Sequence, residues 1–197
     1  MDLELVKKIN GMVGRCFPFD MCMDFIARFG HLMFILYGVW LWFSGSGETR
    51  RERRFCAIEA LIGVAVASVI SFGIGKAWNR PRPFTRTQEI WNFTAHKANA
   101  SFPSNHTMNS AVISLALLRH HMPGAWGMAV LSVLLAFSRV YAGIHYVTDL
   151  IGGAVIAWAV HRGIAQSAVM TRLIGGLVTL SVLVEKAVKQ FRMKNAE

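Results

Sequence analysis

The chain has 197 residues, of which 54% are hydrophobic and 16% are charged. Soluble domains carry about 25% charged residues, so this composition excludes an ordinary soluble domain and favours one membrane domain over residues 1–197. The net charge is +10. Its lysines and arginines stand in short clusters between apolar segments, which fits anionic lipid headgroups better than nucleic acid. The three cysteines show neither metal-ligand spacing nor a disulfide framework.

Five apolar segments predict helices that cross a membrane, for which about 20 mostly apolar residues are needed. They cover residues 23–43, 56–75, 107–118, 125–138 and 150–160. The last three segments are short, so we expect their helices to extend into the polar residues on either side. The pattern predicts an all-α bundle of about five to six transmembrane helices, without an internal repeat or a second domain.

The N-terminal segment, residues 1–20, is a candidate for an amphipathic helix on the membrane surface. Its apolar residues can share one face of a helix, and they are Leu3, Val6, Ile9 and Val13. The alternative interpretation is a frayed terminus.

Residues 170–194 are a second candidate for an interfacial helix. Their uncharged stretch, residues 173–184, is about 18 Å long as a helix, which is too short to cross a bilayer unaided. A sixth crossing would also place the cations that follow outside the cell, although short basic segments stay inside. These cations are Lys186, Lys189, Arg192 and Lys194. We therefore favour five crossings with this tail on the cytoplasmic face.

Basic clusters orient the chain, because short basic loops remain on the cytoplasmic side of a membrane. Residues 50–54 contain four arginines and are predicted to form a charged loop inside the cell, and the turn at residues 119–124 lies on the same side. The loop at residues 76–106 and the turn before Asp149 then face outward. This orientation brings two polar motifs and Arg82 to the extracytoplasmic ends of the helices.

The two polar motifs are residues 101–106 and residues 137–149. Together with Arg82, which lies between two prolines that stiffen its loop, they supply two imidazoles, two guanidiniums, a hydroxyl and a carboxylate. This set of groups suits nucleophilic attack on a phosphoryl group. Guanidiniums bind phosphate through paired N–H groups, so Arg82 and Arg139 are candidate phosphate ligands. The alternative for both is snorkelling toward lipid headgroups.

His145 and Asp149 are four residues apart and can share one face of a helix, where the carboxylate accepts from one ring nitrogen. That contact fixes the tautomer and leaves the other nitrogen free to act as a nucleophile. The alternative is a purely structural His–Asp pair.

Ser104 and His106 open a predicted helix directly after Pro103. Serine is a favoured N-cap, and the free N–H groups of a helix start bind anions. Ser104 and the backbone amides are therefore candidates to hold phosphate oxygens. His106 is placed to protonate a leaving oxygen as a general acid.

These residues resemble the signature of the type 2 phosphatidic acid phosphatase superfamily of integral-membrane lipid phosphatases, which reads K-x6-R-P, P-S-G-H and S-R-x5-H-x3-D. The chain has Arg82-Pro83, then Pro103-Ser104-Asn105-His106, and then Ser138-Arg139 with His145 and Asp149 at the family spacing. The motifs extend over residues 76–149, and the apolar helices around them match the family's core.

The resemblance implies a role for each matching residue. His145 would be the nucleophile that forms a phosphohistidine, and Asp149 would orient it. His106 would be the acid and later the base that activates water. Arg82, Ser104 and Arg139 would bind phosphate. The family needs no metal ion, so no cofactor is expected.

The chain departs from the signature at two positions. Five residues separate Lys76 from Arg82 where the family has six, so either the loop is tightened or the lysine's role is absent. Asn105 replaces the family glycine and, with Lys76, is kept as a candidate phosphate ligand. Asn105 and the preceding residues 96–104 are similar to bacterial undecaprenyl pyrophosphate phosphatases of the bacitracin-resistance type. In that group aspartate stands near Asn99 and at Asn105.

This similarity implies hydrolysis of undecaprenyl pyrophosphate to the monophosphate on the outer face of the bacterial cytoplasmic membrane, which recycles the lipid carrier of cell-wall synthesis. The expected partners are this lipid and membrane lipids. A phosphatidylglycerophosphate or phosphatidate phosphatase and a lipid phosphotransferase are alternatives. A transporter or scaffold is disfavoured, because the charges cluster at helix ends and not at mid-span. His96 and Lys97 are candidates to contact a distal phosphate, and His31, His120, His121 and His161 are interpreted as structural.

Overall fold

The computed structural model describes residues 1–195, and over this range the chain is all-α without a strand. A short 3-10 helix, Pro83–Thr85, lies in the long loop after the third helix. The seven α-helices are α1 (Asp2–Asn10), α2 (Phe17–Phe43), α3 (Gly47–Ala77), α4 (Asn105–Arg119), α5 (Ala125–Tyr141), α6 (Val147–Gln166) and α7 (Ala168–Lys194). The predicted fold class, a membrane helix bundle, is confirmed.

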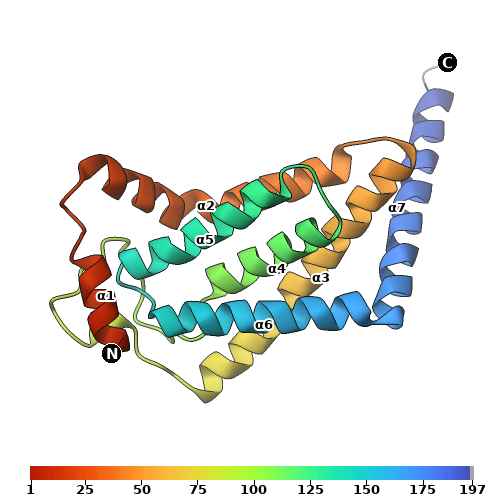
Figure 1. The fold of residues 1–197 in the computed structure, drawn as a ribbon. Helices are drawn as coiled ribbons and strands as arrows, with labels where there is room; N and C mark the ends of the chain where they lie inside the picture. Colours follow the sequence, from red (N-terminus) through yellow and green to blue (C-terminus); the bar gives the residue numbers. More distant parts are fainter. Residues whose placement is uncertain (196–197) are drawn as a thin grey trace.

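The helices are arranged around α4, which packs against α3, α5 and α6. Figure 1 shows α2, α4, α5 and α6 running alongside one another, with α1 at one end of the bundle and α7 across the other end. Polar contacts join the central helices: the Ser110 and Ser132 hydroxyls lie 2.7 Å apart, and Ser114 donates to Met128 O at 3.2 Å. Small residues of this kind let helices approach closely inside a membrane.

The helices extend into the polar motifs, as expected from the shortness of their apolar segments. α4 begins at Asn105, α5 ends at Tyr141 and α6 begins at Val147. The motif residues therefore lie at helix ends and in the connections between them, all at the α1 end of the bundle. This arrangement is what positions the site described below.

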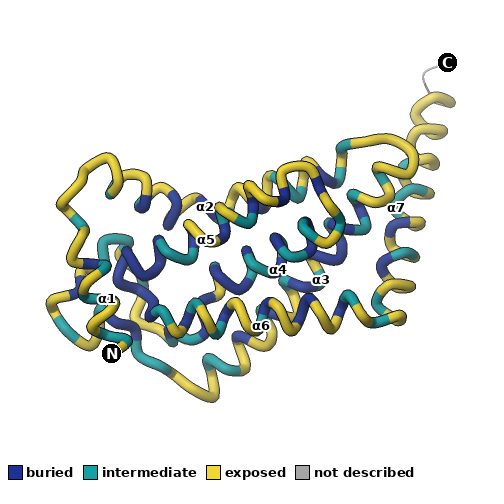
Figure 2. The backbone as a smooth tube through the Cα atoms, viewed as in Figure 1, coloured by how far each residue is buried: buried dark blue, intermediate teal, exposed yellow. Residues whose placement is uncertain are grey.

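The outer surface of the bundle is apolar, as a lipid environment requires. Figure 2 shows buried residues facing inward and exposed residues along the outer faces of the helices. Large apolar side chains on these faces include Phe25, Leu36, Leu61, Phe72 and Val133. Within residues 1–195, α2, α3 and α7 are long and apolar enough to cross a membrane, and α5 is a shorter apolar helix. We conclude that the chain is a membrane protein.

The four arginines of residues 50–54 do not form a loop, so that prediction is wrong. They lie in the first turns of α3, and only residues 44–46 connect α2 to α3. Arg54 is 4% exposed, and its Nη2 donates to Glu185 Oε2 at 2.7 Å. Arg50 donates to the other oxygen of Glu185 at 2.5 Å. A carboxylate far along the chain therefore balances the cluster and lets it be helical.

The argument that the tail is too short to cross a membrane is also wrong. The helix does not stop at residues 173–184 but runs from Ala168 to Lys194, which gives it 27 residues. Ile174 and Val178 are its buried residues, and they pack in the cluster that α3, α4 and α6 share. In Figure 1 this helix lies across the end of the bundle, away from α1. Its position at the cytoplasmic face remains a prediction.

The apolar residues expected to share one face of residues 1–20 pack against protein, and the position of this segment at the membrane surface remains a prediction. Val6 is fully buried with Ile90, Val140 and Tyr146, and Leu3 packs against the same cluster. The segment is also interrupted, because α1 ends at Asn10 and α2 begins at Phe17. α1 therefore covers one end of the bundle.

A buried polar cluster surrounds Glu59 of α3, away from the end of the bundle that α1 covers. Its Oε2 lies 2.7 Å from Arg119 Nη1 and 2.8 Å from His120 Nε2. Nδ1 of His161 lies 3.6 Å from the other carboxylate oxygen. The cluster ties α3, α4 and α6 together, which agrees with the structural role expected for His120 and His161.

Candidate active site

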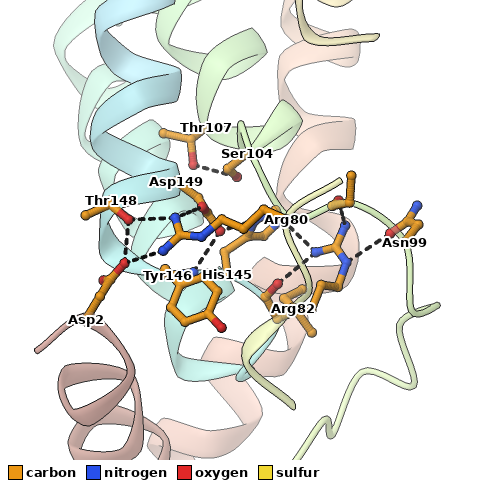
Figure 3. Close-up of polar contacts among 12 residues, drawn as sticks. Asp2, Arg80, Arg82, Asn99, Ser104, Thr107, His145, Tyr146, Thr148 and Asp149 are labelled. Carbon is orange, nitrogen blue, oxygen red and sulfur yellow. Dashed lines mark hydrogen bonds and ion pairs between the residues drawn. The ribbon is translucent and has the colours of Figure 1, made fainter. Parts of the chain in front are cut away.

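The polar motifs meet at the end of the bundle where α1 lies (Figure 3). His145 comes from the connection between α5 and α6, Asp149 from the first turn of α6, and Arg82 from the long loop between α3 and α4. All three side chains are buried. Segments that are far apart in the sequence therefore form one site.

Asp149 contacts His145 through the capping of α6. His145 precedes the helix, whose N-cap is Tyr146. Oδ2 of Asp149 accepts from the Tyr146 N–H at 2.9 Å and lies 3.3 Å from Nδ1 of His145. The contact that the sequence predicts is thus present, but it arises from helix capping and not from a shared helix face.

The turn before His145 requires a glycine. Gly143 has a φ of +73°, in the left-handed region that side chains disfavour. A Cβ at this position would lie 2.5 Å from Cγ2 of Ile90. The turn can therefore pass close to the long loop and present the imidazole to it.

Arg82 is held by four acceptors that fix its guanidinium against His145. Nε donates to Asn99 Oδ1 at 2.9 Å, and Nη2 donates to Ala100 O at 3.0 Å. Nη1 donates to Ile144 O at 2.8 Å and lies 3.1 Å from Nε2 of His145. With the proton on Nδ1, which Asp149 favours, the Nε2 lone pair faces a cation.

The protonation states of these two groups follow from their burial. Burial lowers the pKa of His145 to about 4, a value that already includes the lowering by the nearby charges of Arg82 and Arg139 and the opposing effect of the Asp149 contact. Burial also lowers the pKa of Arg82, to about 10. At neutral pH the imidazole is therefore neutral and the guanidinium is charged.

Arg139 and His106 complete the inner side of the site. Arg139 is 3% exposed, and its Nη1 donates to Ala27 O at 2.7 Å. Its Nε is buried and has no hydrogen-bond partner within the described part of the chain. The His106 ring stands edge-on to His31, with 5.4 Å between ring centroids. Arg139 and His145 both lie close enough to the His106 ring to interact with it electrostatically.

Ser104 is the N-cap of α4, as predicted, but its hydroxyl makes a different contact from the expected cap bond. Its Oγ accepts from Thr107 Oγ1 at 3.0 Å, and its N–H donates to Asp149 O at 3.2 Å. The Met108 N–H is the first to bond back along the helix, to Ser104 O at 2.9 Å. The earlier N–H groups of α4 are the free donors of a helix start. Asn105, the first helical residue, is exposed beside them.

Arg80 is a site residue to which the sequence interpretation gave no role. Nη1 donates to Asp149 Oδ1 at 2.5 Å and to Thr148 Oγ1 at 2.7 Å, while Nη2 donates to Asp2 Oδ2 at 2.7 Å. Its guanidinium also stacks 4.0 Å from the centroid of the Tyr146 ring. The available signal was the alternating Arg-Pro run in which Arg80 precedes Arg82 by two residues.

Lys76 does not join the other candidates. It is exposed in the last turn of α3, with Nζ 5.7 Å from the centroid of the Phe72 ring. No hydrogen bond or ion pair within residues 1–195 links it to the site. His96, by contrast, is half-buried, and burial lowers its pKa, as do the charges of Arg82 and Arg139.

Comparison with known proteins places this geometry in a family. The model of the PAP2 superfamily matches residues 56–173, which include all the motif residues. Undecaprenyl-diphosphatase BcrC of Bacillus subtilis is 30% identical over 157 residues, which cover 80% of this chain and 79% of the relative.

Two solved structures share the fold. LpxE of Aquifex aeolicus has a TM-score of 0.65 and 22% identity, and the match covers 82% of this chain and 92% of that one. A transmembrane PAP2 type phosphatidylglycerolphosphate phosphatase from Bacillus subtilis has a TM-score of 0.58 and 21% identity, covering 83% of this chain and 85% of that one.

The motif residues of the matched family lie together at one end of this membrane helix bundle. The family match extends over more than half of the chain, so the chain belongs to the PAP2 superfamily. The resemblance noted from the motifs is thereby confirmed.

Arg80 in the long loop and Lys76 at the end of α3 differ sharply in their expected effect on activity. Arg80→Gln should lower kcat for phosphate release by about 10- to 100-fold, because the buried carboxylate of Asp149 loses a charged partner. Lys76→Gln should stay within about twofold of the wild type, since Lys76 is exposed. Phosphate release from lipid substrates in detergent measures both rates. A larger loss for Lys76→Gln than for Arg80→Gln would contradict this ranking.

Proposed function

We propose that the protein hydrolyses undecaprenyl pyrophosphate to the monophosphate through a phosphohistidine on His145. The observation that carries the proposal is the pairing at this ring, where Asp149 lies 3.3 Å from Nδ1 and Arg82 lies 3.1 Å from Nε2. A neutral imidazole held in this way can attack phosphorus from Nε2. The substrate is proposed from the likeness to undecaprenyl-diphosphatase BcrC, which covers 80% of the chain.

The first step begins when the pyrophosphate enters beside Arg82. Its terminal phosphate takes N–H donors from Arg82 and Arg139, which releases the Nε2 lone pair of His145. Nε2 then attacks the terminal phosphorus, so a P–N bond forms while the bond from phosphorus to the bridging oxygen breaks. The two guanidiniums and the N-terminus of α4 stabilise the charge on the equatorial oxygens. Ser104, Asn105 and that helix terminus hold the phosphate in place.

The leaving group and water complete the cycle through His106. The negative charge of the bound pyrophosphate stabilises a proton on the His106 ring, and the departing undecaprenyl monophosphate takes that proton. His106, now neutral, removes a proton from a water molecule that attacks the phosphorus. The P–N bond breaks, inorganic phosphate leaves, and both rings return to their starting states. Asp149 keeps the proton of His145 on Nδ1 throughout.

The side of the membrane on which the site opens is proposed from its position in the bundle. We place the site at the outer face of the bacterial cytoplasmic membrane, since the basic start of α3 lies at the opposite end. A lipid carrier whose pyrophosphate faces outward after cell-wall synthesis would meet the site there. The enzyme would then return the carrier to its monophosphate form. At the site, Arg82 and Arg139 would balance the negative charges of the phosphate.

The substrate assignment is tested by lipid competition. We expect phosphate release from undecaprenyl pyrophosphate to exceed release from phosphatidic acid and phosphatidylglycerophosphate by at least about tenfold in kcat/KM, measured in the same detergent micelles. Competition between the lipids in one reaction gives the same ratio without reference to micelle concentration. Equal or faster turnover of either phospholipid would instead support a phosphatidylglycerophosphate or phosphatidate phosphatase.

A further inference from the structure

A cavity of about 260 Å³ lies beside His106, between α2 and α4. Its polar lining residues come from α2 and from the first turns of α4, and they are His31, Asn105, His106, Asn109 and Ser110. Its apolar lining residues lie further along these two helices and on α3 and α5, and they are Phe34, Ile35, Ile113, Val64 and Leu135. The polar groups are therefore gathered at the end of the cavity where His106 lies.

Two polar atoms of this lining are buried and have no hydrogen-bond partner within residues 1–195: Nδ1 of His31 and Oδ1 of Asn109. Leaving such an atom unpaired destabilises a fold, so buried polar atoms usually bond to water or to a ligand. Both residues stand close to His106. The His31 ring is edge-on to it, with 5.4 Å between the ring centroids. Asn109 follows it by three residues on α4 and so shares its helix face.

The chemistry of the two unpaired groups suits a water molecule better than a phosphate. A phosphate requires several N–H donors or a cation, and among the described residues no lysine or arginine lines this cavity. An imidazole nitrogen donates or accepts according to its tautomer, and either end of the Asn109 carboxamide can bond to water. A buried water commonly makes about three hydrogen bonds, which His31, Asn109 and His106 can supply.

We propose that His31 and Asn109 hold the water molecule that hydrolyses the phosphohistidine, an inference that rests on the proposed function and adds two positioning residues to it. In-line displacement requires the water to approach phosphorus opposite Nε2 of His145, on the side from which the undecaprenyl monophosphate departed. His106 acts on that side in both steps. His31 and Asn109 occupy the other hydrogen bonds of the water and so aim its lone pair at phosphorus. This role replaces the structural one expected for His31 from the sequence.

The bonds that change in this step are few. The water oxygen bonds to phosphorus while one of its protons passes to His106. The P–N bond breaks, and its electron pair returns to Nε2 of His145. Inorganic phosphate then leaves. His31 and Asn109 neither gain nor lose a proton, so their removal should misplace the water without altering the chemistry of the first step.

Separate measurement of the two chemical steps tests this assignment. With undecaprenyl pyrophosphate labelled in its terminal phosphate, rapid quenching gives the rates at which the phosphohistidine forms and breaks down. His31→Ala should slow breakdown by about 10- to 100-fold and keep formation within about threefold of the wild type, because a misplaced nucleophile costs this much. The labelled enzyme should therefore accumulate in the variant. A merely structural role would slow both steps.

Three further variants complete the experiment. His31→Asn should restore most of the rate of breakdown, because an amide atom bonded to Cγ takes the place of Nδ1. Leu32→Ala is the matched control, since Leu32 is an exposed residue in the same turn of α2, and it should leave both steps unaltered. Asn109→Leu removes the second contact and should slow breakdown alone. It also decides the question if His31→Ala fails to fold.

Two kinds of result would overturn the water site while leaving the proposed function intact. One is an equal slowing of formation and breakdown, which would indicate contact with the departing phosphate or a role in packing. The other is an unchanged rate of breakdown in His31→Ala or in Asn109→Leu. A wild type that carries no labelled histidine at any quench time would instead refute the proposed function, and the water site with it.

Discussion

His145→Ala is expected to abolish phosphate release, with a loss of at least about 10⁴-fold in kcat, because the variant has no ring nitrogen to form the P–N bond. The protein should remain folded. Arg82 keeps its bonds to Ile144 O, Asn99 and Ala100 when the imidazole is removed. Phosphate release and the thermal unfolding of the purified variant in detergent measure the two effects separately.

Trapping the covalent phosphoenzyme tests the role of His145 directly. Wild-type enzyme quenched during turnover of labelled substrate should carry an acid-labile phosphoramidate, and His145→Ala should carry none. His121→Ala is a suitable control, since His121 is an exposed histidine in the turn between α4 and α5. It should retain both activity and label. Substantial residual turnover by His145→Ala, or the same label on it, would remove His145 from the nucleophile role.

The sequence predicted the groups that gather at the site because their chemistry is encoded locally. Spacing within one motif places His145 and Asp149 within reach of each other, and Pro103 with Ser104 marks the start of a helix. The orientation of the basic clusters was enough to bring Arg82 to the same end. None of these inferences required knowledge of how the helices pack.

Contacts between distant segments could not be predicted in the same way. Arg80 bonds to Asp2 of α1 and to Asp149 of α6, and no local spacing connects these three residues. The arginines at the start of α3 were interpreted as a loop because their partner, Glu185, lies on α7. A run of like charges in a sequence is interpreted as a solvated loop when the opposite charge that packs against it is not known.

Lys76 shows the limit of a motif as a guide. The family signature places a lysine near this position, but the helix carrying it continues to Ala77 and leaves the side chain exposed. The guanidinium of Arg80 stands beside Asp149 instead. A one-residue change in spacing at the end of a helix turns a side chain by about 100°, which is enough to move it from the site to the surface.

Asp149→Asn is expected to lower kcat by about 10²- to 10⁴-fold with little change in KM, because a carboxylate that sets the tautomer of a catalytic histidine contributes up to this much. In the wild type, Oδ2 accepts from the Tyr146 N–H and faces Nδ1 of His145. An amide nitrogen at this position would donate to Nδ1 and shift the ring proton to Nε2. The nitrogen that must attack phosphorus would then lack its lone pair.

Asp149 also pairs with Arg80, so the tautomer effect must be separated from the loss of this ion pair. Asp2→Asn is the matched control: it removes the other carboxylate on Arg80 without touching His145. We expect Asp2→Asn to keep most of the activity, whereas Asp149→Asn loses it. Equal losses in the two variants would mean that both carboxylates act by holding Arg80. The orientation of His145 would then have to come from Arg82 and Ile144 alone.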